Sequence, residues 1–171
     1  FHLRIEKNKK FNLYYYHNYN GLLKKILTEI KFSKNEALVY HIIEKKIIIC
    51  PELSLYDYWI PVPYHSSKIK DRKFNLTILL FKDFFKRLDV SFLPIMQRIK
   101  NTVPLFELTY LERQKELRNA FEFQLDPCCL KNKRLLVVDD IYTTGATFEA
   151  IRSLLGCYAP SIVDILCLCK T

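Results

Sequence analysis

Apolar residues along the chain follow two spacings, one typical of strands and one typical of helices. Short apolar or alternating runs predict strands at residues 3–5, 13–16, 58–63, 90–95, 135–138 and 162–169. Stripes spaced three or four residues apart predict helices at residues 22–31, 35–47, 74–88, 111–118 and 148–156. The first two runs flank a basic turn at residues 7–10, so they predict a β-hairpin.

The order of these elements predicts the fold class. Strands alternating with helices over residues 51–171 predict an α/β core with a doubly wound, mostly parallel sheet. Residues 1–50 predict an N-terminal extension, a hairpin and two helices, that packs on this core. At 171 residues the chain suits one domain, or one domain with a small appendage.

The strand at residues 135–138 runs into a small, hydroxyl-rich loop and then into a helix. Backbone N–H groups in the first turn of a helix lack intrahelical partners, and the helix dipole favours an anion there. The loop therefore predicts a phosphate site built from small and hydroxyl-bearing residues: Thr143, Thr144, Gly145, Ala146 and Thr147.

Two adjacent carboxylates, Asp139 and Asp140, lie between this strand and this loop. Like charges repel, so they are not expected to contact phosphate. They suit two vicinal hydroxyls, or a Mg²⁺ ion shared with the ligand. Acids and loop together predict a site for a phosphorylated ribose. The alternative is a purely structural strand–turn–helix with an acidic N-cap.

The segment at residues 135–147 resembles the phosphoribosyl-pyrophosphate (PRPP) signature of the type I phosphoribosyltransferases. The wider chain resembles the ComF-type proteins (ComFC-like), the competence-linked branch of that superfamily. The matching segments cover nearly the whole chain, at residues 19–21, 31–32, 60–65, 72–75, 98–102, 108–121 and 135–147. Departures are Lys73 for the usual Gly and Leu76 for the usual Gln; Leu105, Glu116 and Asn119 also differ from the usual residues.

The resemblance implies that PRPP is a substrate or ligand and that Mg²⁺ accompanies it. The ion would bind through PRPP, and Asp139 is the candidate for a direct contact with the protein. Asp139 and Asp140 would be the catalytic pair that orients the ribose. PRPP also carries a pyrophosphate, and the turn after residue 63 is expected at the same edge of the sheet. Arg72, Lys73 and Lys68 in that turn would bind the pyrophosphate; exposed loop charge is the alternative.

The resemblance also implies cytoplasmic handling and uptake of single-stranded DNA during natural transformation. A formal net charge of +9 fits polyanionic partners, although a generally basic proteome would give the same charge. Aromatic rings beside cations suit single strands, so the candidate DNA contacts are Tyr15, Lys9, Lys10, Lys24 and Lys100. Genuine nucleobase phosphoribosyltransferase activity in salvage metabolism is one alternative, and PRPP as a regulatory ligand is another.

The cysteines and the lengths of the apolar runs bear on zinc binding and on membrane insertion. The six cysteines include no C-x-x-C pair, so we expect no structural zinc site within the chain and buried thiols such as Cys167 and Cys169 in a reducing cytoplasm. The resemblance to ComF-type proteins implies a small four-cysteine zinc module, which would lie upstream of Phe1. The longest apolar runs are far below the roughly 20 residues that span a bilayer, so no membrane insertion is expected.

Overall fold

The computed structural model describes residues 2–33, 37–44, 50–72, 74–102 and 108–171. The N-terminal part contains β1 (Arg4–Lys7), β2 (Asn12–Asn18), α1 (Gly21–Ser33), α2 (Ala37–Glu44), η1 (Pro51–Leu55) and β3 (Tyr58–Pro61). The middle contains α3 (Ser66–Arg72), α4 (Leu76–Arg87), β4 (Ser91–Phe92), β5 (Met96–Arg98), α5 (Tyr110–Leu117) and β6 (Phe121–Phe123). The last part contains η3 (Pro127–Leu130), β7 (Arg134–Tyr142), α6 (Ala146–Gly156) and β8 (Ile162–Lys170).

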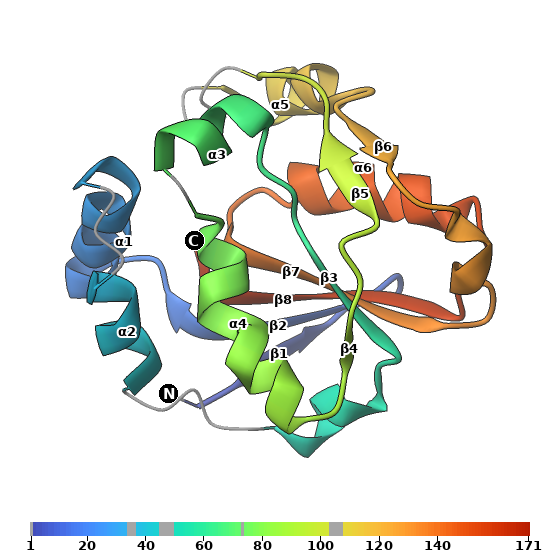
Figure 1. Cartoon of the computed structure of the whole chain (residues 1–171), viewed down its shortest axis with the longest axis horizontal. Helices are drawn as coiled ribbons and strands as arrows, with labels where there is room; N and C mark the ends of the chain where they lie inside the picture. Colours follow the sequence, from blue (N-terminus) through green and yellow to red (C-terminus); the bar gives the residue numbers. More distant parts are fainter. Residues whose placement is uncertain (1, 34–36, 45–49, 73, 103–107) are drawn as a thin grey trace.

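A six-stranded sheet in the order β1-β2-β8-β7-β3-β4 forms the centre of the molecule (Figure 1). The pairings β2–β8, β8–β7, β7–β3 and β3–β4 are parallel, and only β1–β2 is antiparallel. The long strands β7 and β8 pair from Arg134–Ile162 to Tyr142–Lys170. The mostly parallel α/β sheet predicted from the apolar pattern is therefore confirmed.

Alternate residues of the strands pack into two separate cores, one on each face of the sheet. Leu136 and Val138 of β7 face a cluster that contains the apolar sides of α1, α2 and α4. Leu135 and Val137 face a second cluster with α5, α6 and η3. Because both faces are covered by helices, the sheet is doubly wound, which explains why β7 and β8 are apolar on both sides.

The N-terminal hairpin belongs to this same sheet. Its strand β2 pairs in parallel with β8, in a register that places Tyr15 beside Cys167. The chain then enters α1, which follows the end of β2 near the carboxyl ends of the parallel strands (Figure 1). No helix in the described ranges is both long and apolar enough to cross a bilayer.

The structure departs from the sequence pattern at three places between residues 65 and 98. The polar turn predicted at residues 65–73 forms α3, where the ring Nδ1 of His65 accepts the backbone N–H of Ser67 at 3.2 Å and occupies a donor of the first turn. The strand predicted at residues 90–95 shortens to the two residues of β4, and Pro94 follows. Residues 96–98, to which the apolar pattern assigns no element, form β5, which pairs with β6 in a second, antiparallel sheet.

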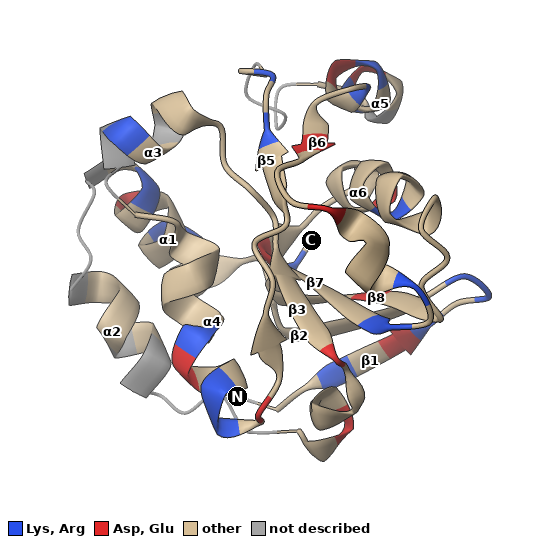
Figure 2. Cartoon of the chain, turned by 45° about the vertical axis from the view of Figure 1, so that its right-hand side comes forward, with Lys and Arg blue, Asp and Glu red and all other residues tan. Residues whose placement is uncertain are grey.

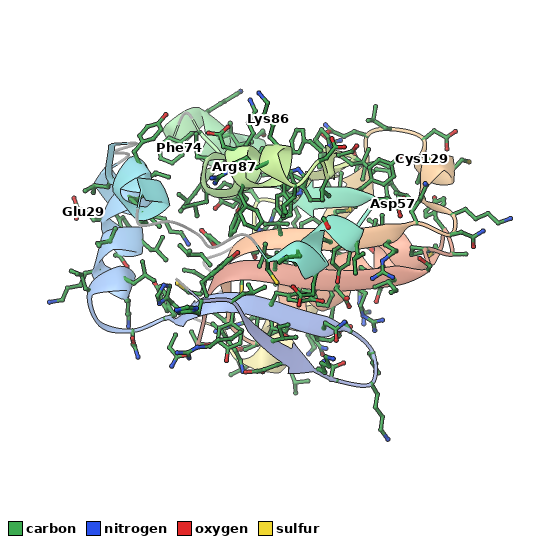
Figure 3. All side chains as sticks on the ribbon, turned by 90° about the horizontal axis from the view of Figure 1, so that it is seen from below. Glu29, Asp57, Phe74, Lys86, Arg87 and Cys129 are labelled. Carbon is green, nitrogen blue, oxygen red and sulfur yellow. The ribbon has the colours of Figure 1, made fainter. Side chains whose placement is uncertain are left out.

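All six cysteines are free thiols. Cys167 and Cys169 are buried, as predicted, whereas Cys128, Cys129 and Cys157 are exposed. Cys129 on η3 lies at the opposite end of the molecule from Glu29 on α1 (Figure 3). Within the described ranges, no three His, Cys, Asp or Glu side chains are grouped so that they could hold a metal ion.

A buried carboxylate ties the hairpin to the rest of the sheet. Asp164 of β8 accepts hydrogen bonds from the backbone N–H of Asn12 at 2.7 Å, from its Nδ2 at 2.9 Å and from the Tyr56 hydroxyl at 2.5 Å. We expect Tyr56→Phe to lower the free energy of unfolding by about 1–3 kcal/mol, because the carboxylate loses a buried hydrogen bond. Urea unfolding measures this. The control Tyr58→Phe should change little, and equal losses in both variants would contradict the assignment.

Candidate functional site

The two predicted acids lie near the end of β7. Asp140 is 5% exposed, and Asp139 is half-buried beside it. The backbone N–H of Asp140 donates to Oδ1 of Asp139 at 2.8 Å. Neighbouring side chains of a strand point to opposite faces, so Asp139 and Asp140 leave the strand on different sides. The local hydrogen bond helps to fix the orientation of the Asp139 carboxylate.

Asp140 is held from two other parts of the chain. Lys31 at the end of α1 places its Nζ 2.7 Å from Oδ2 of Asp140. The hydroxyl of Tyr64, which follows β3, donates to the same oxygen at 3.0 Å. A buried carboxylate is stable as an anion only when it is paired and hydrogen-bonded. These contacts therefore provide its compensation.

Asp139 has a raised pKa. Burial is the main cause, and the charge of Asp140 adds to it; the positive charges of Lys31 and Arg98 act in the opposite direction. An anionic carboxylate at this point is thus costly in the absence of a further partner. A cation or a pair of hydroxyl donors would stabilise it.

The predicted phosphate loop joins β7 to α6. Gly145 adopts a left-handed conformation, with φ of +79°, and is the N-cap of α6, which begins at Ala146. Thr143 and Thr144 are exposed, and Thr147 is partly exposed within the first turn. The structure therefore brings the hydroxyls, the close-approach residues and the helix N-terminus together at the end of the strand that carries the acids.

Gly145 is the position in this loop where a side chain is hardest to accommodate. A Cβ there would overlap the Tyr142 ring, with Cζ at 2.8 Å, and the left-handed φ disfavours any other residue. We expect Gly145→Ala to lower the free energy of unfolding by about 1–2 kcal/mol and to weaken binding of a phosphate ligand at the loop. Unfolding and ligand titrations measure the two effects. Gly156→Ala, in the same helix with open space around its Cα, should show neither.

Arg113 of α5 belongs to the site, although the sequence predicts no role for it. It lies within the family-like segment at residues 108–121. Its Nη1 donates to the hydroxyls of Thr143 at 3.0 Å and Thr144 at 3.5 Å, while its Nε donates to the carbonyl of Leu108 at 2.9 Å. A guanidinium beside the loop adds a fixed positive charge to the N-terminus of α6. No local pattern indicates this contact, because 30 residues separate Arg113 from Thr143.

The structure says little about the residues predicted to bind pyrophosphate. Lys68 and Arg72 belong to α3, but their side chains, and the whole of Lys73, lie outside the described residues. A pocket of about 440 Å³ lies beside α3. Its lining comes from the end of β3, the ends of α3 and α4, and β5, and includes Tyr64, His65, Gln97, Arg98 and Gln124.

Arg98 links this pocket to the acids. Its charge lowers the pKa of Asp139, and its Nε is buried with no hydrogen-bond partner among the described residues. Its Nη2 donates to the hydroxyl of Thr102. The guanidinium therefore retains a donor in the region between the pocket and the acid pair.

The predicted nucleic-acid contacts are not brought together. Tyr15 is only 8% exposed; its hydroxyl donates to Glu6, and Arg4 and Lys170 lie over its ring. These neighbours leave little of the ring surface free, and its contact with a base stays a prediction. Lys9 and Lys10 lie at the hairpin turn, whereas Lys24 lies on α1 near Tyr19 and Lys100 pairs with Glu116 at 3.1 Å.

Comparison with known proteins gives relatives but no matching family model. Competence protein F of Haemophilus influenzae is 32% identical over 105 residues, which are 61% of this chain and 46% of that protein. The DNA utilization protein YhgH of Salmonella typhimurium is 26% identical over 161 residues, 90% of this chain and 70% of that protein. YhgH of Escherichia coli K12 is 29% identical over 120 residues, 70% of this chain and 52% of that protein. The chain thus matches about half the length of the Haemophilus and Escherichia proteins.

Solved structures give weaker likenesses. A hypoxanthine phosphoribosyltransferase of Staphylococcus aureus aligns with a TM-score of 0.42 and 18% identity, over 72% of this chain and 61% of that one. A purine phosphoribosyltransferase of Pyrococcus horikoshii aligns with a TM-score of 0.36 and 19% identity, over 81% and 75%. We rest no argument on these low scores. The sequence relatives are the stronger likeness, and they make the chain a homologue of Competence protein F and of DNA utilization protein YhgH.

Proposed function

We propose that this protein binds PRPP in a phosphoribosyltransferase-like site and acts in the cytoplasmic handling of single-stranded DNA during natural transformation. The observation that carries the PRPP proposal is the end of β7, where Asp139 and Asp140 adjoin the loop at residues 143–147 and the N-terminus of α6. The names of the relatives, which refer to competence and DNA utilization, support the DNA role.

The ligand would lie across the end of β7. Its 5-phosphate would accept hydrogen bonds from the loop at residues 143–147, with Arg113 supplying further charge. The ribose hydroxyls would donate to the acids, of which Asp139 has the greater exposure. Lys31 and Tyr64 would keep the Asp140 carboxylate fixed, so that the sugar is held without reorganisation of the site.

The pyrophosphate end requires positive charge. Mg²⁺ prefers oxygen ligands, which fits the Asp139 carboxylate together with ligand oxygens, and the ion would neutralise charge on the departing pyrophosphate. Lys68, Arg72 and Lys73 remain our proposal for the protein's own pyrophosphate contacts, and Arg98 would add a donor from the side of β5.

If transfer occurs, the bond between C1 of the ribose and the pyrophosphate oxygen breaks. The lone pair of an acceptor nitrogen forms the new bond to C1, the bonding pair leaves with the pyrophosphate, and the N–H proton of the acceptor is lost to water. Fixed negative charge beside the ribose would stabilise the positive charge that develops at C1. The acid pair would then act on the transition state as well as on the bound sugar.

A genuine nucleobase phosphoribosyltransferase of salvage metabolism is the second candidate. The pocket of about 440 Å³ beside β3 favours it. Its apolar lining includes Pro63 and Met96, which suit the face of a planar heterocycle, whereas the amide of Gln97 is already bonded to Glu122 and Gln124. This candidate and the first share the PRPP site and differ in the acceptor.

Pyrophosphate release tests these proposals. The protein is incubated with PRPP, Mg²⁺ and, in turn, each nucleobase or a single-stranded oligonucleotide. Release that depends on one nucleobase would identify a salvage enzyme, and release that depends on DNA would identify DNA as the acceptor. Calorimetric binding of PRPP without release in any mixture would indicate a regulatory ligand, and the absence of binding would contradict the proposed site.

A further inference from the structure

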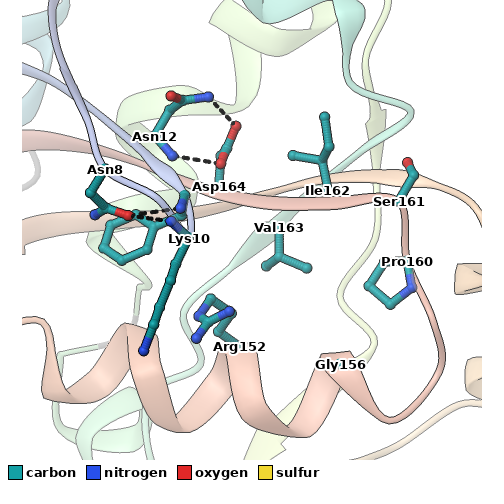
Figure 4. Close-up of a pocket in the computed structure, with 11 residues that line it drawn as sticks. Asn8, Lys10, Asn12, Arg152, Gly156, Pro160, Ser161, Ile162, Val163 and Asp164 are labelled. Atoms are coloured by element: carbon teal, nitrogen blue, oxygen red, sulfur yellow. Dashed lines mark hydrogen bonds between the residues drawn. The ribbon is translucent and has the colours of Figure 1, made fainter.

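A second cavity lies at the opposite edge of the sheet from the acid pair. It has a volume of about 380 Å³ and lies between the hairpin turn at residues 8–11, α6 and the beginning of β8 (Figure 4). We call it the basic groove. It borders Ile162 and Asp164, whose partners on β7 are Arg134 and Leu136. Asp139 lies five residues beyond Arg134, about 17 Å along an extended strand.

Two cationic side chains enter the groove from opposite sides. Lys10 extends from the hairpin turn toward α6, and Arg152 rises from α6 into the same space (Figure 4). Arg152 uses Nε and Nη2 on Glu149, at 3.2 and 3.1 Å, which leaves Nη1 for another partner. Within the described ranges, no acceptor contacts Nζ of Lys10. Arg152 is thus paired with Glu149, and Lys10 supplies the positive charge in the groove that no described acid pairs.

The one carboxylate in the lining does not change this conclusion. Asp164 is 2% exposed and accepts three hydrogen bonds, two from Asn12 and one from Tyr56. These donors surround both of its oxygens, so the carboxylate is committed to the sheet and not to a ligand. The groups that remain for a ligand are cationic or neutral and polar, as in Asn8 and Ser161.

Positive charge continues beyond the groove, along the same edge of the molecule. Lys and Arg residues lie on the hairpin, at the beginning of β7 and on α6 (Figure 2). Lys7 and Lys9 are exposed at the hairpin, and Lys131 is exposed as well. Its neighbour Asn132 donates its backbone N–H to the carbonyl of Ala159, next to Pro160 of the groove lining. A small anion would need only the groove. An extended basic edge favours a ligand with repeated phosphates.

An aromatic ring completes the lining. Phe11 is partly exposed and packs edge-on against Phe148, with ring centroids 4.7 Å apart. Bases of single strands stack on such rings beside cationic side chains, and the contact tolerates any base sequence. Double-stranded nucleic acid keeps its bases stacked on one another, so a lone ring beside the cations fits a single strand better.

We propose that the basic groove binds the backbone of single-stranded nucleic acid, with Lys10 and Arg152 on phosphates and Phe11 beside a base. This inference deepens the proposed DNA role and rests on it, but not on PRPP binding. Because the groove and the acid pair lie at opposite ends of the strands, both ligands would bind at the same time. Lys10 keeps the role that the sequence predicts, and Phe11 takes the place of Tyr15.

Fluorescence anisotropy with a labelled single-stranded oligonucleotide, at several salt concentrations, tests the proposal. We expect Lys10→Gln/Arg152→Gln to weaken binding about tenfold at low salt and to reduce the salt slope by about two. Phe11→Leu, which keeps the apolar contact, should weaken binding without changing the slope. The control Lys25→Gln/Lys86→Gln removes the same charge from exposed positions on α1 and α4.

Three outcomes would overturn the proposal. They are no binding by the wild type, an equal loss in the control, and competition by a mononucleotide as effective as that of unlabelled oligonucleotide. PRPP titration of the same variants separates the two sites. Unchanged PRPP affinity beside weakened DNA binding supports the groove. Absent PRPP binding in the wild type, with DNA binding still dependent on the groove, would refute the PRPP site alone.

Discussion

Asp139→Asn/Asp140→Asn is expected to lose PRPP binding while the protein stays folded. Asn has nearly the same shape as Asp, but it lacks the negative charge and turns one acceptor into a donor. A hydrogen bond to a charged group contributes about 1.5–3 kcal/mol, so each replacement should weaken binding roughly 10- to 150-fold. The double variant should then show no measurable heat in a calorimetric titration with PRPP and Mg²⁺.

The matched control is Asp83→Asn, which removes an exposed carboxylate from α4 on the outside of the molecule. It should bind PRPP with the affinity of the wild type. Circular dichroism shows whether the double variant is folded. A folded double variant that binds PRPP as tightly as the wild type would show that the acids do not contact the ligand.

Lys31→Met is expected to lower the free energy of unfolding by about 2–4 kcal/mol. Removing one partner of a buried ion pair leaves an uncompensated charge and costs about 3–5 kcal/mol. We reduce this range because the Lys31 side chain is 23% exposed and because Tyr64 still donates to Asp140. Urea unfolding measures the loss. Lys25→Met, on the exposed side of the same helix, should lose far less.

A double-mutant cycle isolates the ion pair. In an Asp140→Asn background, Lys31→Met should cost much less than in the wild type, because no buried charge remains to be paired. Lys31→Arg should restore part of the stability. An identical cost of Lys31→Met in both backgrounds would mean that Lys31 stabilises the protein by packing and not through Asp140.

The end of β7 was predictable because its information is local. A β-branched apolar run predicts a buried strand, and the following hydroxyl-rich turn and helical stripe predict where α6 begins. Gly145 is the residue with the fewest conformational restrictions in that turn, and it adopts the positive φ. Strand, turn and helix start are therefore fixed by neighbouring residues.

The partners of these residues were not predictable, because they come from distant parts of the chain. Lys31 lies on the polar side of an amphipathic helix, where periodicity cannot distinguish a solvated lysine from one that reaches a buried acid. Arg113 belongs to a short charged helix, where the same ambiguity holds. Only the packing of α1 and α5 against the ends of the strands decides these contacts.

Tyr15 shows a different limit. Alternation correctly separates Tyr14 and Tyr16 from Tyr15, which contact different cores. It does not show whether the second side of a strand is open. Here Arg4 and Glu6 of β1 and Lys170 of β8 contact the Tyr15 side chain, so the side of β2 that carries it is buried as well.

The central claim is that a phosphorylated ribose binds across the end of β7. A crystal structure of the protein with PRPP and Mg²⁺ tests it most directly. The account predicts the 5-phosphate within hydrogen-bond distance of the loop at residues 143–147, and the ribose hydroxyls on the carboxylates of Asp139 and Asp140. PRPP bound elsewhere, or in this cleft with its phosphate away from that loop, would contradict it.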